Sequence, residues 1–417
     1  MTRSSARSVA LNALQRWRKE NDRADAIIAR LFVETALSAP DRALSLELFY
    51  GVLRNLTLLD FWRAQLRRAH VDAELRDILR LGLYQLFRLE TPEHAAVNET
   101  VGLAPARGRK LINGVLRAAV RRREELRSLA AAQSLSVRES HPQFLIDRWQ
   151  ENFGAEITEA LCRWNNQPPP IYGRVNQLKI DRARFLELCR DAQPLSGSDD
   201  FVAFDSFPNA AIENGHCYVQ DPSTAIAGHL LDPQRGEKVL DACAAPGGKT
   251  AYLAELMQNR GLIVACDRAP DRLALLDENM KRMGAAIVQR CPIDWTRDPV
   301  PGKITATAPF DRVLVDAPCT NTGVMRRRVD VRWRLTRADF KRMQRRQIEI
   351  VRAVVPLLKP GGVLVYSTCS LEPEENEEVV KALLDQMSIL RAKQEKRSLP
   401  FRDGFDGAFA IKLLKTG

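Results

Sequence analysis

The sequence lacks the cysteine spacing of a zinc site or of a disulfide framework. Its eight cysteines stand singly along the chain, with no CxxC pair and no regular interval between them. Isolated cysteines of this kind are typical of a reducing compartment, where thiols stay free. We therefore expect a cytoplasmic protein without a metal site.

Long apolar runs are also missing. None approaches the roughly 18 residues that a membrane-spanning helix requires, and no charged-then-apolar signal peptide opens the sequence. The first residues, MTRSSARSVALNALQRWRK, carry Arg and Ser without acids, as transit peptides do. Their Ala and Leu recur at helical spacing, however, and this pattern predicts the first helix of a domain. We expect no membrane partner.

Acidic residues are outnumbered by basic ones. The 417 residues contain 63 Lys and Arg against 52 Asp and Glu, a formal net charge of +11. Most of these cations are Arg, whose guanidinium group matches the geometry of phosphate. We therefore expect a polyanionic partner, and the length allows two or three domains with buried cores.

Glycines and β-branched runs are scarce in the N-terminal third. Stretches such as LRLGLYQLFRLE (79–90) and LINGVLRAAVRRR (111–123) place apolar residues on one stripe and Arg on the other. This pattern predicts an all-α domain at 1–135. A single Arg of this kind is most simply part of a solvated face, but the group as a whole fits a surface that binds nucleic acid.

The pattern changes twice after the helical part. Residues 136–217 mix short helical and extended stretches around the break QPPP, which predicts a small α+β linking domain. From 218 to 417, the apolar runs KVLDAC, LIVACD, AIVQRC, DRVLVDA and GGVLVYS alternate with helical stretches. Such alternation predicts an α/β fold with a Rossmann-like, doubly wound parallel sheet.

The loop after the first of these strands, DACAAPGGKT (241–250), matches neither GxGxxG nor GxxxxGK[ST]. Its glycines still let the backbone approach a ligand closely, and the helix that follows offers free amides. Asp267 follows the second strand, where a carboxylate can bind ribose hydroxyls, and Asp294 follows the third, where adenine could be held, with Asp298 as a competitor. Asp316 ends the fourth strand. These carboxylates indicate a nucleoside site, and without a phosphate cradle S-adenosylmethionine fits better than NAD or ATP.

Two cysteines follow strands directly. Cys319 lies in FDRVLVDAPCTNTG and Cys369 in GGVLVYSTCSLEPEEN, each where an apolar run meets polar turn residues. The fourth and fifth strands of such a sheet lie side by side, and ligands bind beyond their carboxyl ends. Both thiols are therefore expected to face one substrate. Inert, buried thiols are the simplest interpretation of Cys162, Cys189, Cys217, Cys266 and Cys291.

These motifs resemble the RNA 5-methylcytosine methyltransferases, and within them the bacterial 16S ribosomal RNA enzymes with an N-terminal NusB-like domain. The resemblance rests on DACAAPGGKT, DAPCTNTGVMRRR and YSTCSLEPEENE, and in the helical part on YGVLR, RLGLYQL, HAAVNE and INGVLR. It covers nearly the whole chain, and its two-cysteine signature is highly specific. It implies S-adenosylmethionine-dependent methylation of cytosine C5 in ribosomal RNA of the small subunit.

The resemblance also implies residue roles. Cys369 would be the nucleophile, and Cys319 would assist product release. Asp316 lies three residues before Cys319, so we expect it near the base, at the N3 region of the cytosine. No obligate protein partner is evident beside the RNA. Cofactor contacts are implied for Cys243, Ala244, Ala245, Pro246, Gly247, Gly248, Lys249, Asp267, Asp294 and Asp316.

This chemistry explains why two thiols are needed. Cytosine C5 is a poor nucleophile until a thiolate adds at C6, and covalent catalysis splits one difficult step into easier ones. After C5 has taken the methyl group, a base must remove its proton so that the thiolate can leave. The alternative assignment makes Cys319 the nucleophile, as the Pro-Cys thiol is in DNA cytosine methyltransferases, but the cysteine of STCS favours Cys369.

Other functions fit parts of the sequence. The methyltransferase could act on another RNA, such as tRNA. A non-catalytic RNA-binding or antitermination module would need only the helical domain, and the cysteine pair argues against it. A Rossmann oxidoreductase would need the missing GxGxxG. Residues 321–346 carry ten Lys and Arg against two Asp directly after the Cys319 loop, which predicts phosphate contacts.

Overall fold

The computed structural model describes residues 5–89 and 91–417 of the chain. These residues form two compact units, which we name the helical unit and the sheet unit. The helical unit comprises the chain up to Gln167 and Met325–Arg334; the sheet unit comprises Pro168–Val324 and Leu335–Gly417.

The helical unit confirms the all-α prediction for the N-terminal part. Side-chain caps set some of its helix starts, because a cap supplies an acceptor for an N–H group without a partner in the helix. Ser5 accepts from the backbone of Ser8, and Ser38 accepts from that of Asp41. The helices are α1 (Ala6–Lys19), α2 (Ala24–Glu34), α3 (Ala39–Arg54), α4 (Leu56–Leu66), α5 (Ala73–Phe87), α6 (Glu93–Gly102), α7 (Ala106–Arg121), α8 (Arg123–Ala131), α9 (Leu135–Arg138), α10 (Gln143–Phe153), α11 (Ala155–Asn166) and α18 (Val331–Arg334).

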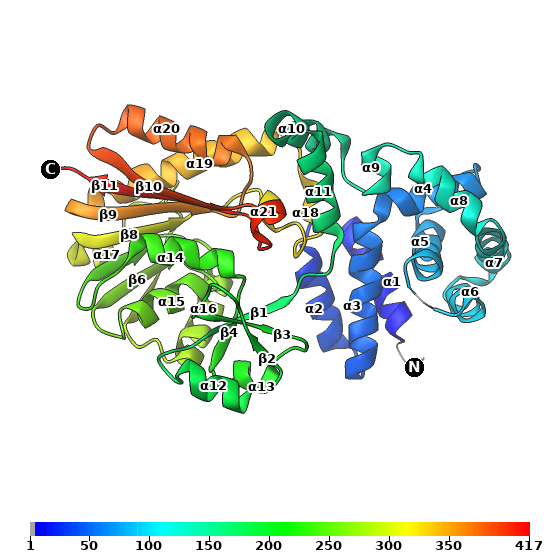
Figure 1. Cartoon of the computed structure of the whole chain (residues 1–417), viewed down its shortest axis with the longest axis horizontal. Coiled ribbons are helices and arrows are strands. Elements are labelled where there is room, and N and C mark those ends of the chain that lie inside the picture. Colours follow the sequence, from blue (N-terminus) through cyan, green and yellow to red (C-terminus); the bar gives the residue numbers. More distant parts are fainter. Residues whose placement is uncertain (1–4, 90) are drawn as a thin grey trace. The chain divides into compact units, whose positions relative to one another are not determined.

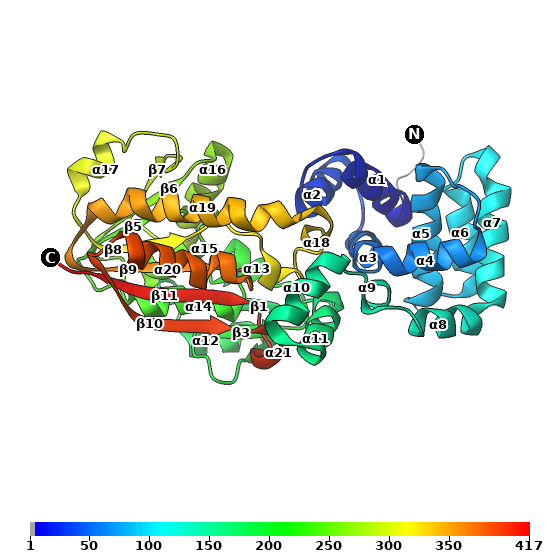
Figure 2. The same cartoon turned by 90° about the horizontal axis from the view of Figure 1, so that it is seen from above.

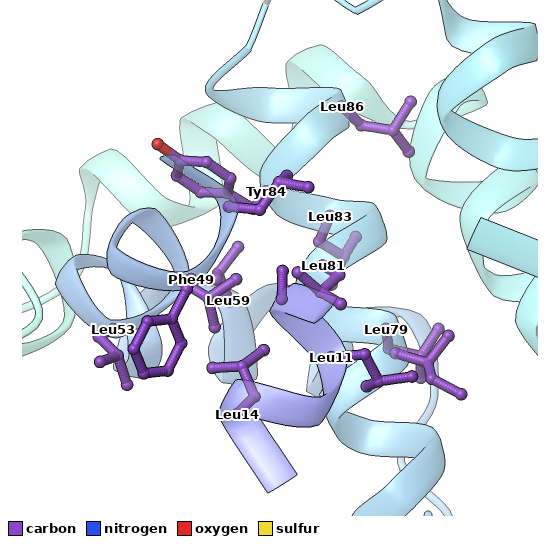
Figure 3. Close-up of a cluster of buried hydrophobic side chains, with 14 of the residues drawn as sticks. Leu11, Leu14, Phe49, Leu53, Leu59, Leu79, Leu81, Leu83, Tyr84 and Leu86 are labelled. Carbon is purple, nitrogen blue, oxygen red and sulfur yellow. The ribbon is translucent and has the colours of Figure 1, made fainter. Parts of the chain in front are cut away.

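Helix α5 forms the centre of the helical unit. It packs against α1, α3, α4, α6 and α7, and its side chains from Ile78 to Phe87 are all buried. Figure 3 shows leucines of α5 meeting Leu11 and Leu14 of α1 and Phe49 and Leu53 of α3 in one apolar cluster. The expected division into an apolar stripe and a solvated Arg stripe is wrong for Arg80 of α5, which is only 8% exposed and donates hydrogen bonds to Asp60 and Asp77.

The segment Met325–Arg334 packs within the helical unit, although it follows the Cys319 loop in the sequence. Arg332 has no exposed surface and donates hydrogen bonds to Asn166 Oδ1 (2.7 Å) and to the Asn165 carbonyl (3.0 Å). Burial lowers the pKa of Arg332 to about 9. The Trp333 indole donates to the Leu53 carbonyl at 2.9 Å. The expectation of phosphate contacts along 321–346 is therefore wrong for Arg332, which is part of a protein core.

The sheet unit begins with a small antiparallel sheet in the order β2–β3–β1–β4. Its apolar core includes Phe185, Val202 and Cys217. This is an α+β layer of the kind expected between 136 and 217, although α10 and α11 belong to the helical unit. Its elements are β1 (Ile171–Val175), α12 (Arg182–Leu188), β2 (Ala192–Pro194), β3 (Phe201–Phe204), α13 (Asn209–Glu213) and β4 (Cys217–Val219). The division into domains at 1–135, 136–217 and 218–417 stays a prediction.

The larger sheet confirms the Rossmann-like prediction. Its strands run in the order β10–β11–β9–β8–β5–β6–β7, and Figure 2 shows β10 and β11 at one edge and β7 at the other. The strands from β9 to β7 are parallel. The elements are α14 (Ala225–Leu231), β5 (Lys238–Asp241), α15 (Gly248–Leu256), β6 (Leu262–Asp267), α16 (Pro270–Met283), β7 (Val288–Pro292), α17 (Gly302–Thr307), β8 (Phe310–Asp316), α19 (Arg337–Val354), β9 (Leu358–Thr368), α20 (Glu377–Gln386), β10 (Leu390–Ser398), α21 (Pro400–Asp403) and β11 (Ala408–Lys415).

Helices cover both faces of this sheet, as a doubly wound fold requires. Figure 1 shows α19 and α20 on one side of the strands and α14, α15 and α16 on the other. Two apolar cores match these faces. One holds Val351 of α19 and Leu383 of α20 against the sheet, and the other holds Leu253 of α15 and Leu276 of α16.

The antiparallel strands β10 and β11 were not predicted from the sequence. β11 pairs with β9 and β10 pairs with β11, both antiparallel. The residues of β10, LRAKQEKRS, are exposed from Arg391 to Arg397. An edge strand of this kind has no buried face, so it shows no apolar alternation.

Candidate active site

The carboxyl ends of the parallel strands bring the predicted site residues to one edge of the sheet. β8 and β9 are neighbours in parallel register, with Asp316 opposite Ser367. The loops that follow these two strands therefore meet, and the sulfur atoms of Cys319 and Cys369 lie 3.1 Å apart. Two thiols that are 50 residues apart in the sequence can thus reach two neighbouring atoms of one substrate.

The loop 241–250 connects β5 to the start of α15. Gly247 has φ +104°, and a Cβ there would lie 2.8 Å from the Met280 side chain, so only glycine fits this position. The Ala244 amide donates to the Cys266 carbonyl at 2.7 Å, which ties the loop to the end of β6. The N–H groups of the first turn of α15 point out of the helix at this loop, an arrangement that suits a polar ligand.

Asp267, at the end of β6, is oriented toward the same loop. Its Oδ1 accepts from the Ala269 amide at 3.0 Å, and its Oδ2 lies 3.2 Å from an Arg272 nitrogen. Arg272 also donates to the Ala245 carbonyl. The carboxylate is only 5% exposed, and it is held at the strand end where a ribose could be bound.

Asp294 and Asp298 form one turn after β7. Asp298 Oδ2 accepts from the Asp294 amide at 2.8 Å, so the side chain of Asp298 caps the turn. Asp294 Oδ1 accepts from the Thr296 hydroxyl at 2.7 Å, and its Oδ2 lies 3.6 Å from Arg346. Burial opposes ionisation here, but hydrogen bonds from Thr296 and the nearby arginines lower the pKa of Asp294 overall.

Asp316 lies between two partners. Its Oδ2 pairs with the Lys249 ammonium at 2.7 Å, and its Oδ1 accepts from the Ser367 hydroxyl at 2.8 Å. Burial acts to lower the pKa of Lys249, but Asp316 raises it overall. Lys249 was expected among the cofactor contacts, and in the structure its ammonium group forms an ion pair with Asp316. Both residues line a pocket together with Ser223, Thr224, Ile226, Ala227, Val324, Ser367, Thr368, Cys369, Asp406, Gly407, Ala408, Phe409 and Ala410.

The two thiols have different surroundings. The hydrogen bond to Cys369, together with burial, raises the pKa of Cys319 well above its usual value. The sulfur of Cys369 lies 3.2 Å from Asn321 Oδ1 and lines the pocket. Asn321 adopts φ +60°, a conformation that Asn tolerates, and its amide donates to the Cys319 carbonyl at 2.8 Å. Asn321 thus links the two loops, a role that its place in TNTG did not reveal.

The backbone of Gly323 passes directly over the Cys369 loop. Its amide donates to the Cys369 carbonyl at 3.0 Å, and its carbonyl accepts from the Gly407 amide at 2.8 Å. A Cβ on Gly323 would lie 2.8 Å from the Cys369 carbonyl oxygen and 2.8 Å from the Gly407 Cα. Because both contacts are to backbone, a side chain here would displace the Cys369 loop.

The other cysteines lie outside this pair. Burial raises the pKa of Cys162 and of Cys217 to about 12, which agrees with inert thiols. Cys291 differs, because a hydrogen bond from Cys266 lowers its pKa to about 7. Within residues 5–89 and 91–417, no cluster of three or more His, Cys, Asp or Glu side chains could hold a metal ion. In the same part of the chain, no helix is long and apolar enough to cross a membrane.

Three family models match the chain. The model described as "16S rRNA methyltransferase RsmB/F" matches residues 228–413, that of the NusB family matches 4–121, and a "Methyltr_RsmF/B-like, ferredoxin-like domain" matches 141–194. The three matches follow one another along the sequence. Together they span the N-terminal helices, the middle segment and the larger sheet.

Similar whole proteins carry the same arrangement. A probable ribosomal RNA small subunit methyltransferase B of Bacillus subtilis (strain 168) is 34% identical over 458 residues, with 100% of both chains covered. Ribosomal RNA small subunit methyltransferase B of Enterobacter sp. (strain 638) is 35% identical over 442 residues, again with 100% of both covered. The crystal structure of the protein PH0851 superposes with a TM-score of 0.79 at 25% identity, covering 98% of each chain.

Proposed function

Because this chain belongs to the 16S rRNA methyltransferase RsmB/F family of S-adenosylmethionine-dependent RNA cytosine-5 methyltransferases, we propose that it methylates a cytosine C5 of small-subunit ribosomal RNA. The observation that carries the proposal is the pair of sulfurs 3.1 Å apart at the ends of β8 and β9. Beside them lies a pocket with an ammonium group and a carboxylate, Lys249 and Asp316. We place the protein in the cytoplasm, where such RNA is found.

Cys369 is the nucleophile in this proposal. Its sulfur lines the pocket, so it can add to C6 of a cytosine bound there. Addition moves electron density toward N3 and O2 of the ring, and the Lys249 ammonium stabilises that charge. Asp316 holds Lys249 in place and can accept a hydrogen bond from the cytosine amino group. In this proposal Lys249 acts on the base, and its expected contact with the cofactor stays a prediction.

S-adenosylmethionine supplies the methyl group as an electrophilic sulfonium when it is bound. The residues at the strand ends fit this ligand, because Gly247 keeps the loop free of side chains and Asp267 presents a carboxylate for ribose hydroxyls. Asp294, the first carboxylate after β7, is our candidate for adenine, with Asp298, whose Oδ2 caps the turn, as the alternative. The rest of the contacts would come from the loop Cys243–Gly248.

Cys319 assists release. After C5 has gained the methyl group, its proton must go to a base, and the electron pair of that C–H bond then restores the ring double bond and expels the Cys369 thiolate. Cys319 is the nearest thiol to the Cys369 sulfur. Two cysteines thus divide one reaction, with addition assigned to one and release to the other.

The helical unit offers a cationic face for the phosphate backbone. α7 contains no acidic residue, and its exposed Arg107, Lys110, Arg117 and Arg121 lie along one side at helical spacing. We name these four side chains the α7 cationic face. A row of this length meets several phosphates, so it would position RNA without reading its sequence.

A methyl-transfer assay tests the proposal. Purified protein is incubated with radiolabelled S-adenosylmethionine and separately with 16S ribosomal RNA and total tRNA, and bisulfite sequencing locates the modified base. We expect 5-methylcytosine in the ribosomal RNA. Methylation of tRNA alone would overturn the proposed substrate, and absence of transfer to both RNAs would overturn the proposed activity.

A further inference from the structure

We propose that Glu375 is a positioning residue that fixes the Cys319 and Cys369 loops relative to each other. The inference rests on the proposed roles of the two cysteines. Glu375 lies in the short helix Pro373–Glu375 after Cys369, and its side chain has no exposed surface. Its carboxylate accepts hydrogen bonds from both cysteine loops and from α19.

On the Cys319 side, Glu375 contacts the residue next to the thiol. Its Oε2 accepts from the Thr320 amide at 2.9 Å, and its Oε1 accepts from the Thr320 hydroxyl. The Gln347 amide group of α19 donates both to Glu375 Oε2 at 2.9 Å and to the Pro318 carbonyl at 2.9 Å. The residues directly before and after Cys319 are therefore tied to one carboxylate.

On the Cys369 side, the contact is again to the next residue. Glu375 Oε1 accepts from the Ser370 hydroxyl at 2.7 Å. The Tyr366 hydroxyl of β9 donates to the Glu375 carbonyl at 2.6 Å, which fixes the short helix against the strand that leads to Cys369. The same carboxylate thus bridges the residues that follow both sulfurs.

The donor set suits a carboxylate at this position. Thr320 supplies two donors, Ser370 one and Gln347 one. An ionised carboxylate only accepts and has lone pairs for all four donors, whereas the amide group of a glutamine keeps one accepting oxygen and would force the Thr320 and Ser370 hydroxyls to turn round and accept from its NH2 group. A buried polar group left without its partner costs more than the bond itself contributes. Glutamine, although equal in size, should therefore weaken this junction, because its hydrogen bonds are neutral and two of them reverse direction.

Its effect on catalysis follows from distance. The sulfurs lie 3.1 Å apart, and the attacking sulfur must approach C6 while the second sulfur stays within reach of C5. A displacement of about 1 Å in a reacting group costs on the order of 10²-fold in rate. Loss of the Glu375 bridge should slow both steps, because each half of the bridge serves one thiol.

The test compares Glu375→Gln with Glu378→Gln. Glu378 is exposed on α20 and accepts a hydrogen bond from the Gln344 amide group, so its variant makes the same chemical change away from the cysteines. RNA containing 5-fluorocytidine reports addition, because C5 then carries no proton and the adduct persists on a denaturing gel. We expect Glu375→Gln to form this adduct roughly 10²-fold more slowly than wild type, with unchanged affinity for S-adenosylhomocysteine, and Glu378→Gln to match wild type.

Milder variants test the two halves separately. Ser370→Ala removes the donor on the Cys369 side and should slow adduct formation. Thr320→Val removes the hydroxyl on the Cys319 side, so it should form adduct normally with ordinary cytidine but release it slowly. A purely structural residue would not divide the two steps in this way. These variants also decide the matter if Glu375→Gln proves too unstable to assay.

The outcomes are distinct. Adduct formation by Glu375→Gln at the wild-type rate overturns the positioning role, and so does wild-type behaviour of both Ser370→Ala and Thr320→Val in both steps. Absence of any adduct with the wild-type protein instead overturns the proposed covalent function on which this inference rests.

Discussion

Replacing one cysteine at a time should separate the two chemical steps. Without Cys369 no C6 adduct can form, so Cys369→Ala should lose both methylation and covalent capture of RNA. Without Cys319 the adduct should form and accept the methyl group, but its elimination should stall. The reason is the 3.1 Å contact between the sulfurs, which would bring the Cys319 thiol close to C5 when the Cys369 sulfur attacks the neighbouring C6.

The electrostatics of the pair support this order. The hydrogen bond to Cys369, together with burial, raises the pKa of Cys319 and so favours the protonated form of that thiol before the reaction starts. Once Cys369 becomes a thioether, its sulfur is a much weaker acceptor, and the pKa of Cys319 falls. Cys319 can then lose its proton and serve as the base for C5.

The size of the effect can be worked out from this role. A positioned base contributes about 10²- to 10⁴-fold to a proton transfer. With a typical turnover of about 10 per second, an adduct lifetime of about 0.1 s in the wild type would lengthen to roughly 10–1000 s in Cys319→Ala. An adduct that survives for this time outlasts quenching in denaturant.

The assay is a denaturing gel of labelled RNA after incubation with S-adenosylmethionine. We expect a shifted band for Cys319→Ala and none for Cys369→Ala, while Cys189→Ala, a partly exposed cysteine of the sheet unit, should behave as wild type. The reverse result, a band for Cys369→Ala and none for Cys319→Ala, would show that the thiol after β8 is the nucleophile.

Three further predictions concern the cofactor, the core and the RNA. Asp267→Ala should weaken the affinity for S-adenosylhomocysteine, measured by calorimetry, by about 10- to 100-fold, the value of hydrogen bonds to a charged group, and should leave the affinity for RNA unchanged. The control is Asp277→Ala, which removes an exposed carboxylate, and an unchanged cofactor affinity of Asp267→Ala would contradict the ribose assignment. Burial raises the pKa of Asp241 to about 7, so the folded state binds more protons than the unfolded state between about pH 4 and 7. The free energy of unfolding of the wild type should therefore fall by roughly 4 kcal/mol relative to that of Asp241→Asn as pH rises through this window. Urea unfolding at several pH values measures both proteins, and an equal pH dependence of the two free energies would disprove the prediction. Replacing Lys110, Arg117 and Arg121 together by alanine should reduce the slope of log affinity for RNA against log salt concentration by about 2, as measured by fluorescence anisotropy. Arg127→Ala is the control, and an unchanged slope would show that α7 has another role.

The general fold and the meeting of the two thiols could be predicted because they follow from local patterns. Alternation of apolar strands with helices predicts a parallel sheet, and parallel strands place their carboxyl ends together. Cys319 and Cys369 each end such a strand, so their proximity requires only that β8 and β9 be neighbours, as they are. The assignment of each residue to the cofactor or to the base stays a prediction.

Longer-range features could not be predicted in this way. Lys249 belongs to the glycine loop in sequence, but its direction depends on where α15 starts and on the carboxylate of Asp316 across the sheet edge. Glu375 follows a proline in an acidic stretch that suggests a solvated turn, and its burial depends on donors from loops at Thr320 and Gln347. Such convergence of polar groups arises only in the folded chain.

The segment Met325–Arg334 shows why substitution is a sharper test of the helical unit than deletion. Removing residues 1–135 would strip the partners of Trp333, which donates to Leu53, and of Arg334, which donates to the carbonyl of Trp17. This segment starts six residues after Cys319 and ends just before α19, which carries Gln347. A deletion would therefore disturb the Cys319 loop together with the proposed RNA-binding face. The α7 cationic face lies on exposed side chains, so its substitution tests the proposed phosphate contacts while leaving this packing intact.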